Sequence, residues 1–438
     1  MPAQTLSSRE LLKRLGDGES ISSICEAVGC SRTDFDLWWR RETESRKPNC
    51  DGHINVKVHD SVTIRRDRWG IPHVSAERAE DLWFGFGYAM AQDRLFQLDY
   101  LRRKGLGRLA EILGLEGLPL DIAARTVGLN RIAQAELERL PPETREVLNN
   151  FASGINAWIE GCGDSLPIEF DLLDYRPAPW SPVDSLAIEV EFRWYLTGRF
   201  PVIVMPEIAK RVLGEGAKYK EFLLGEADTE AIIPPEAYAN LRRDLIGDVW
   251  EHLNSLPCEL VGQTTSDPEG TGSNNWVIAG RHCRSGGSMV ASDPHIAFEA
   301  VSCWYEAHLQ GPGLNVVGMA YAGMPAIMFG RNEHVAWGIT NNICSLRDLY
   351  QEQIDADHPN CFRFADTWEP VRELTEVIEV RGSQPVSRVI RFSRNGPVVN
   401  EILPLSAEQT GPVTVKWLGA IEGGWLTSLL AMDRACSV

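Results

Sequence analysis

The chain has 438 residues, 44% of them hydrophobic, and a formal net charge of −18 at pH 7. A chain of this length and composition buries a large core and has room for two or three domains. The excess of Asp and Glu leaves no basic face for a nucleic acid, and no run of about 18 apolar residues predicts a membrane-spanning helix. We therefore expect no nucleic-acid partner and no membrane partner.

The cysteines and the first residues of the chain bear on the cellular compartment. The ten cysteines are scattered, with no Cys-x-x-Cys pair, which predicts reduced thiols. The N-terminus has no basic segment followed by an apolar one, so it lacks the pattern of a signal peptide. We expect a cytoplasmic protein.

Residues 1–48 predict a small unit of three helices. Helical patterns cover 8–15 and 21–28, the second ends at Gly29, and Ser31 is placed to cap a third helix. Three short helices with a glycine-containing turn have the shape of a helix-turn-helix, which binds DNA. The unit carries eight basic and eight acidic residues, so it offers phosphate no net attraction. We favour a docking or solubilising role.

Residues 49–255 predict a helix-rich region that opens with strands. Alternating residues at 56–58 and 62–64 indicate short strands, and the apolar spacing over 81–98 indicates a long helix. We interpret His73 as a structural histidine, because no nucleophile lies near it in the sequence. The region contains no phosphate loop, no metal-spaced His and Cys cluster and no internal repeat.

The stretch from Ser273 to His295 predicts a β-hairpin that begins on a serine. Turn-forming residues fill 264–272, and strand-like residues follow on both sides of a polar turn. Antiparallel pairing about that turn sets Ser273 opposite roughly Pro294 and His295, within a residue or two. A serine and a histidine that are distant in sequence are therefore expected to be neighbours.

Four blocks of sequence carry a resemblance to a known family. They read SNNWVI at 273–278, SDPH at 292–295, GMPAIMFGRNE at 323–333 and AWGIT at 336–340. These blocks, at this spacing from the serine, resemble the penicillin acylases, which include cephalosporin and acyl-homoserine-lactone acylases. The resemblance implies an α+β fold of the N-terminal nucleophile hydrolase type, a partial αββα sandwich of stacked antiparallel sheets covered by helices.

The resemblance implies that Ser273 is both nucleophile and base. A serine hydroxyl needs a base to attack a carbonyl, and cutting the Gly272–Ser273 bond would give Ser273 an α-amine with a pKa of about 7.7–8.0. The precursor would cut itself there, with 256–272 as spacer, and leave an α/β heterodimer whose β chain begins with 273–438. Ser273 would then attack a small acyl amide, such as the side chain of a β-lactam or an N-acyl-homoserine lactone, and form an acyl-enzyme.

The same register implies further site residues. His295 would orient the α-amine, and the backbone N–H of Asn341 would donate to the oxyanion. Phe329, Ile296 and Ile339 would line an apolar acyl pocket. An ordinary structural role remains an alternative for each of them.

The resemblance requires no cofactor, although it implies a structural calcium ion. Calcium takes clustered oxygen ligands, and the family's ligands match Glu207 and Asp348. Ser345 and Arg347 stand at other ligand positions, so the set is incomplete.

The family's second oxyanion donor is an asparagine that lies further from the nucleophile than this chain extends. Residues 425–438 predict a helix without a C-cap. We therefore expect a C-terminally truncated chain. Two functions stay open, an amidohydrolase and a non-catalytic fragment that acts as a binding module, while a helix-turn-helix regulator fits the charge least.

Overall fold

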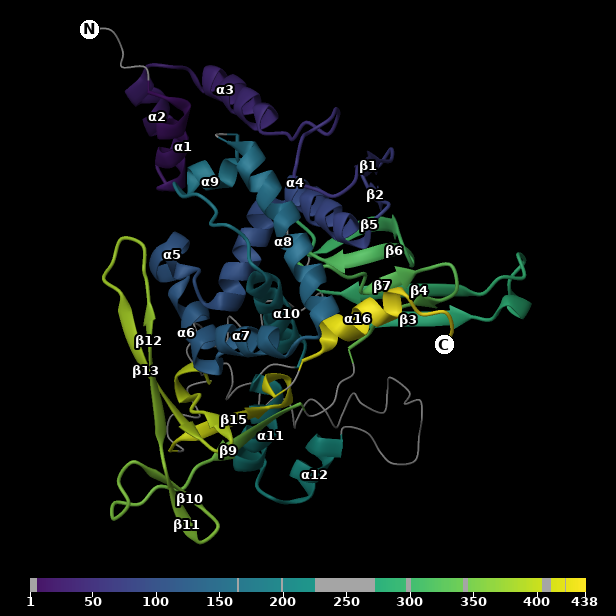
Figure 1. Ribbon diagram of the computed structural model, residues 1–438. Helices are drawn as coiled ribbons and strands as arrows, with labels where there is room; N and C mark the ends of the chain where they lie inside the picture. Colours follow the sequence, from purple (N-terminus) through teal and green to yellow (C-terminus); the bar gives the residue numbers. More distant parts are fainter. Residues whose placement is uncertain are drawn as a thin grey trace.

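The computed structural model places helices mainly in the first half of the chain and strands mainly in the second (Figure 1). The α+β class expected from the sequence is therefore confirmed. The structure describes residues 6–163, 165–197, 200–224, 272–296, 301–341, 346–403, 411–421 and 423–438.

The three-helix unit at the N-terminus has a small core of its own. Its helices are α1 (Ser8–Gly16), α2 (Ile21–Val28) and α3 (Arg32–Ser45). Ser31 caps α3 through a capping box with Asp34, as predicted, and Gly29 ends α2 at a φ of 74°, which glycine adopts without strain. Ile24 and Phe35 are buried between the helices. The predicted helices are confirmed.

The three-helix unit packs on the rest of the chain at α9 (Ile168–Leu172). Arg46, just after α3, forms an ion pair with Asp171 at 2.8 Å, and both side chains are largely buried. Lys13 pairs with Asp174 at 3.0 Å. Buried, paired charges of this kind hold one orientation, so the unit is attached to the body at this helix.

Helix α4 (Ala79–Leu106), which contains the predicted helix over 81–98, runs through the centre of the molecule. Helix α8 (Pro142–Cys162) crosses it closely. A Cβ on Gly154 would lie only 1.9 Å from the backbone carbonyl oxygen of Phe84. Only glycine permits so close an approach of two helices, and it lets their apolar faces form the main core.

The remaining helices of this half surround α4. They are α5 (Ala110–Leu113), η1 (Gly114–Glu116), α6 (Leu118–Val127), α7 (Leu129–Arg139), α10 (Pro182–Leu196), α11 (Phe200–Leu213) and α12 (Ala217–Leu224). Within the ranges given above, no helix is both long and apolar enough to cross a membrane.

The largest sheet has six strands in the order β1-β2-β5-β6-β7-β8. Their bounds are β1 (Val62–Arg66), β2 (Pro72–Ala76), β5 (Trp304–Gly311), β6 (Leu314–Tyr321), β7 (Phe329–Arg331) and β8 (Ala336–Trp337). One face packs on α4 through alternating buried residues such as Tyr305 and Leu309. The pair β2–β5 is parallel, so the sheet is mixed rather than wholly antiparallel.

The structure bears on two expectations for the chain around β1 and β2. His73, interpreted as structural, lies opposite His308 across the parallel pair, with 2.9 Å between their Nδ1 atoms. The strand expected at 56–58 is wrong, because the stretch is not in a strand and has no sheet partner among the residues that the structure describes. The N–H groups of His59 and Asp60 instead donate to the carboxylate of Asp81.

The other strands form small sheets. They are β3 (Gly272–Ile278) with β4 (Met289–His295), β9 (Arg347–Gln351) with β15 (Val413–Trp417), β10 (Cys361–Phe364) with β11 (Thr367–Pro370), and β12 (Arg372–Ile378) with β13 (Val386–Ser393) and β14 (Gly396–Pro397). Short 3-10 helices cover Gly280–His282, Asn400–Ile402 and Leu418–Ala420.

Helix α16 (Trp425–Asp433) is the helix expected near the end of the sequence, but it does not run to the last residue. Arg434 caps it, and the side-chain amide of Asn332 donates to the carbonyls of Asp433 and Ala435. The expectation of an uncapped helix was wrong, because the backbone N–H of Arg434 caps it locally and Asn332, distant in sequence, adds further hydrogen bonds at this end. The carboxylate of Asp433 also accepts from the N–H of Ile327.

Candidate active site

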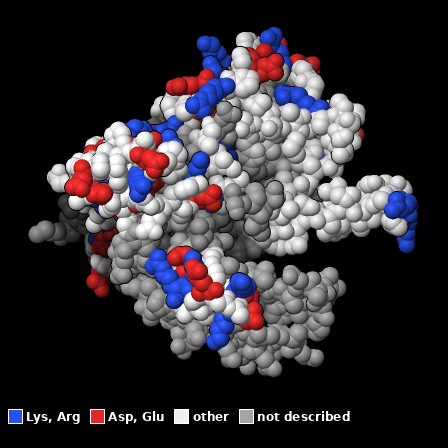
Figure 2. All heavy atoms as spheres, turned by 90° about the horizontal axis from the view of Figure 1, so that it is seen from below, with Lys and Arg blue, Asp and Glu red and all other residues white. Residues whose placement is uncertain are grey.

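The β3–β4 hairpin carries the candidate nucleophile at the end that joins the rest of the molecule. Its register pairs Gly272 with His295 and Ser273 with Pro294, as the sequence predicted. The hairpin extends from the body as an arm, and basic side chains lie at its tip (Figure 1, Figure 2). Residues 279–288 form that tip. The sequence pattern was sufficient here because pairing about one turn fixes every residue opposite another.

The hydroxyl of Ser273 forms a hydrogen bond with the carbonyl of the peptide bond that precedes it. Its Oγ donates to the carbonyl oxygen of Gly272 at 2.6 Å. The carbonyl oxygen of Ser273 itself accepts from the hydroxyl of Thr340 at 3.1 Å. Thr340 thus holds the backbone of Ser273, while Oγ of Ser273 stays in contact with the Gly272 carbonyl group.

His295 lies beside the same peptide bond. Its Nε2 is 3.0 Å from a carboxylate oxygen of Asp293, and about a third of its side chain is exposed. Because that oxygen accepts, the proton of a neutral ring sits on Nε2 and leaves Nδ1 as an acceptor. A Cβ on Gly272 would lie 3.4 Å from Nδ1, so this acceptor faces the backbone just before Ser273.

The segment after β8 runs alongside the hairpin. The backbone N–H of Ile339 donates to Oγ of Ser292 at 3.1 Å. A Cβ on Gly338 would lie 3.0 Å from Cβ of Ser292 and 3.2 Å from that of Asn275. The close approach requires a glycine, and it brings Thr340 onto Ser273.

Asn341 follows directly and is anchored through its side chain. Its Nδ2 donates to the carbonyl oxygen of Leu196, the last residue of α10, at 2.7 Å. Its backbone N–H makes no hydrogen bond to a residue that the structure describes. A backbone donor one residue after Thr340, which contacts Ser273, is therefore available to a ligand, as the role in an oxyanion site requires.

A comparison with known protein families shows to which family the chain is related. The family model described as penicillin amidase matches residues 61–438. The chain belongs to the penicillin amidase family. Membership also confirms the N-terminal nucleophile hydrolase class of fold that the sequence blocks implied. The matched range starts just before β1 and leaves out the three-helix unit.

Named members of the penicillin amidase family are similar along most of this chain. Penicillin acylase 2 proenzyme of Pseudomonas sp. (strain SE83) is 31% identical over 82% of the chain and 46% of its own length. Acyl-homoserine lactone acylase QuiP of Pseudomonas aeruginosa is 29% identical over 90% of the chain and 46% of its own length. The chain thus spans about half the length of the curated relatives it matches.

A solved penicillin G acylase also matches. The thermostable enzyme from Alcaligenes faecalis is 30% identical and covers 40% of this chain and 97% of the solved chain, with a TM-score of 0.35.

The residues expected to line an acyl pocket lie at the edge of the main core. Phe329, Ile296 and Ile339 are each partly buried against it, and Phe329 meets the ring of Trp304 edge to face at 4.8 Å between centroids. A cavity of about 730 Å³ lies elsewhere, between α7 and β13, and none of these three residues lines it. The acyl pocket therefore stays a prediction.

Each of the two expected calcium ligands has a basic neighbour. Glu207 on α11 is exposed and pairs with Arg211 at 3.4 Å, and Asp348 on β9 lies opposite Lys416. Ser345 is outside the described residues. Among the residues that are described, no three His, Cys, Asp or Glu side chains are placed to hold a metal ion. These residues do not fit a calcium site, and no step of the chemistry below uses one.

Arg347, at another of the expected ligand positions, is a buried cation. Its guanidinium carbon lies 3.3 Å from the ring centroid of Trp194, and its Nε donates to Thr197 at 2.8 Å. It therefore joins β9 to the end of α10, the same turn that receives Asn341.

Sequence reasoning missed several groups that hold the site residues in place. The hydroxyls of Thr340 and Ser292 fasten the segment after β8 to the hairpin by hydrogen bonds. The backbone carbonyl of Leu196 accepts a hydrogen bond from the side chain of Asn341. Gly338 was the one available signal, because a glycine between Trp337 and an isoleucine in a strand-like run marks a close backbone approach.

Proposed function

We propose that this chain carries the nucleophile of an amidohydrolase that acts on linear acyl amides and matures by cutting itself before Ser273. The observation that supports it most is the contact between the Ser273 hydroxyl and the carbonyl oxygen of Gly272 at 2.6 Å. His295 stands beside the same bond with an acceptor nitrogen. A serine at the start of a strand, facing its own preceding carbonyl, is arranged for attack on that bond.

Maturation follows from this contact. The oxygen of Ser273 attacks the carbonyl carbon of Gly272, and the hydroxyl proton passes to the nitrogen of Ser273 as the carbon–nitrogen bond breaks. The resulting ester is hydrolysed by water. Gly272 then ends one chain as a carboxylate, and Ser273 begins another with a free amine and a free hydroxyl, which gives the expected α/β heterodimer. The word proenzyme in the name of one relative supports such processing.

Turnover uses the same residue twice. The new α-amine of Ser273, with an unperturbed pKa near neutrality, accepts the hydroxyl proton, directly or through a water molecule. The oxygen attacks the substrate amide, the amine product leaves with that proton, and water hydrolyses the acyl-enzyme. Nδ1 of His295 accepts a hydrogen bond from the α-amine and orients it. The backbone N–H of Asn341 donates to the oxyanion in both tetrahedral intermediates.

The substrate class comes from the relatives and from three side chains. The relatives are named as a penicillin acylase and an acyl-homoserine lactone acylase. Phe329, Ile296 and Ile339 are all apolar and partly buried, so an acyl group seated among them is aliphatic or aromatic. The substrate is therefore an amide with an apolar acyl group.

An amidase assay separates this function from a binding module. Purified chain is incubated with N-acyl-homoserine lactones and acylated β-lactam nuclei of graded acyl length, and release of the free amine is measured. We expect amine release that rises with apolar acyl length and is abolished in Ser273→Ala. Release that is equal for polar and apolar acyl groups would contradict the apolar pocket, and release that survives Ser273→Ala would refute the nucleophile.

A further inference from the structure

A second polar cleft lies between the end of α4 and the start of α10, and it shares no residue with the site around Ser273. Its volume is about 330 Å³. It is lined by Arg102, Arg103, Leu106, Arg108, Arg125, Asn130, Ala178, Pro179, Ser181, Val183 and Asp184. Four guanidinium groups in one cleft are unusual in a chain with a net charge of −18, and nothing in the amide chemistry uses them.

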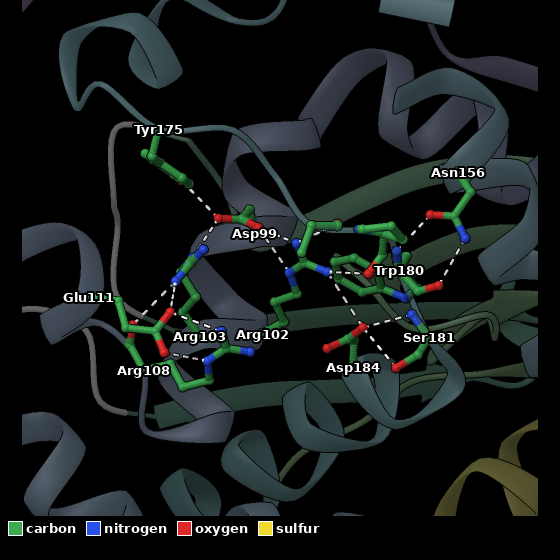
Figure 3. Close-up of polar contacts among 12 residues, drawn as sticks. Asp99, Arg102, Arg103, Arg108, Glu111, Asn156, Tyr175, Trp180, Ser181 and Asp184 are labelled. Carbon is green, nitrogen blue, oxygen red and sulfur yellow. Dashed lines mark hydrogen bonds and ion pairs between the residues drawn. The ribbon is translucent and has the colours of Figure 1, made fainter. Parts of the chain in front are cut away.

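Part of this cleft is a structural network. Arg102 is buried and donates to Asp99, to Asp184 and to the backbone carbonyls of Ala178 and Pro179 (Figure 3). All three of its nitrogen atoms are engaged in this way. Although burial alone would raise the pKa of Asp99, the charges of Arg102 and Arg103 hold it below its ordinary value. Arg102 therefore forms the fixed floor of the cleft.

The other three arginines each keep one nitrogen unused. Arg103 donates through Nε and Nη1 to Asp99 and Glu111, and Arg108 holds Glu111 through Nε and Nη2. Arg125 donates through Nε to the carbonyl of Gly107 and through Nη1 to a carboxylate on β12. Nη2 of Arg103, Nη1 of Arg108 and Nη2 of Arg125 make no hydrogen bond to any residue that the structure describes.

We propose that this cleft binds a phosphoryl group, either as free monohydrogen phosphate or as the phosphate of a monoester. Arginine pairs with phosphate oxygens through directed N–H groups. Unused nitrogens on three different arginines suit a group with three terminal oxygens better than a planar carboxylate. Leu106 and Val183 at the cleft wall give the remainder of a monoester an apolar surface.

The proposal is tested by calorimetric titration of the full chain in phosphate-free buffer at low ionic strength. The probes are inorganic phosphate, phenyl phosphate and, as a planar anion, acetate. We expect one phosphate site per chain and no acetate binding. Equal affinity for the two phosphates identifies free phosphate as the ligand, and tighter binding of phenyl phosphate identifies a monoester. Either outcome supports the site, whereas binding of acetate as tight as phosphate refutes it.

Two substitutions locate the binding. Arg108→Gln removes the most exposed of the three arginines and is expected to weaken phosphate binding about tenfold or more. Asn130→Asp places a like charge in the cleft and is expected to weaken it similarly. Arg394→Gln is the matched control, because Arg394 is 43% exposed, as Arg108 is, and likewise pairs with one glutamate.

Two results would overturn the proposal. No heat with either phosphate at millimolar concentration, from a chain whose circular dichroism shows it folded, refutes the site. An equal loss in Arg394→Gln also refutes it, because the binding would then be unspecific. Ser273→Ala is expected to bind phosphate as the unmodified chain does, so failure of this proposal and failure of the amidase proposal are distinguishable.

Discussion

Replacing Asp433 with asparagine is expected to change how the stability of the protein depends on pH. Burial raises the pKa of Asp433 from 3.8 to about 7, although the Ile327 N–H and Arg434 act in the other direction. One carboxylate oxygen accepts from Ile327 at 3.1 Å, and the other is buried with no hydrogen-bond partner in the described part of the chain. The folded state therefore holds a proton that the unfolded chain releases.

The sign and size of the effect follow from that difference. A group whose pKa is higher in the folded state contributes its stability below the unfolded pKa and loses it as pH rises through the folded pKa. A shift of roughly three pKa units corresponds to about 4 kcal/mol in total, of which about 2.5 kcal/mol is lost between pH 5 and pH 8. Asparagine does not ionise in this range, so Asp433→Asn should not show this loss.

The assay is urea unfolding of the unmodified chain and of Asp433→Asn at pH 5, 6, 7 and 8. The difference in unfolding free energy between the two proteins is expected to move by about 2.5 kcal/mol in favour of the variant from pH 5 to pH 8. Any packing cost of the amide is the same at each pH and cancels in this comparison. Parallel curves, with a constant difference, would refute the account of this buried carboxylate.

Three further predictions concern packing, the serine and calcium. Gly154→Ala is expected to lower the unfolding free energy by about 3 kcal/mol or more, because its Cβ would overlap the carbonyl of Phe84. Gly161→Ala is the control on the same helix: a Cβ there would have no atom of the described residues within 4 Å, so the change is expected to be neutral or stabilising. Thr340→Val is expected to slow cleavage about tenfold or less, since it removes one neutral hydrogen bond to Ser273, and quenched time points resolved on a gel measure it. Calcium and chelator are expected to leave the melting temperature equal within error; a calcium-dependent rise would show that a site forms.

Local pattern was enough for the elements whose partners are near in sequence. The register of β3 and β4 followed from one turn, and the caps at Ser31 and Gly29 followed from residue type. Each depends on contacts made within a short stretch, where alternation, turn residues and capping residues report the structure directly. Family resemblance added the role of Ser273, which no local pattern contains.

Contacts between distant segments could not be foreseen in this way. The parallel pairing of β2 with β5, the hydrogen bonds that Asn332 gives to the end of α16 and the hydrogen bond from Thr340 to Ser273 each join residues far apart in sequence. A lone polar residue gives no sign of its distant partner. The arginine cleft is similar, because Arg102 and Arg103 reach it from α4 and Arg125 reaches it from α6, and only the packing of those two helices brings them together.

Mass spectrometry of the purified 438-residue chain tests the central claim most directly. The account predicts two chains that meet between Gly272 and Ser273, one of them beginning at Ser273 with a free amine. Ser273→Ala is predicted to stay intact, and Ser285→Ala, a serine in the turn of the same hairpin, is predicted to be cut as the unmodified chain is. An intact unmodified chain that is folded, or a Ser273→Ala chain cut at the same bond, would contradict the claim that Ser273 attacks the carbonyl it touches.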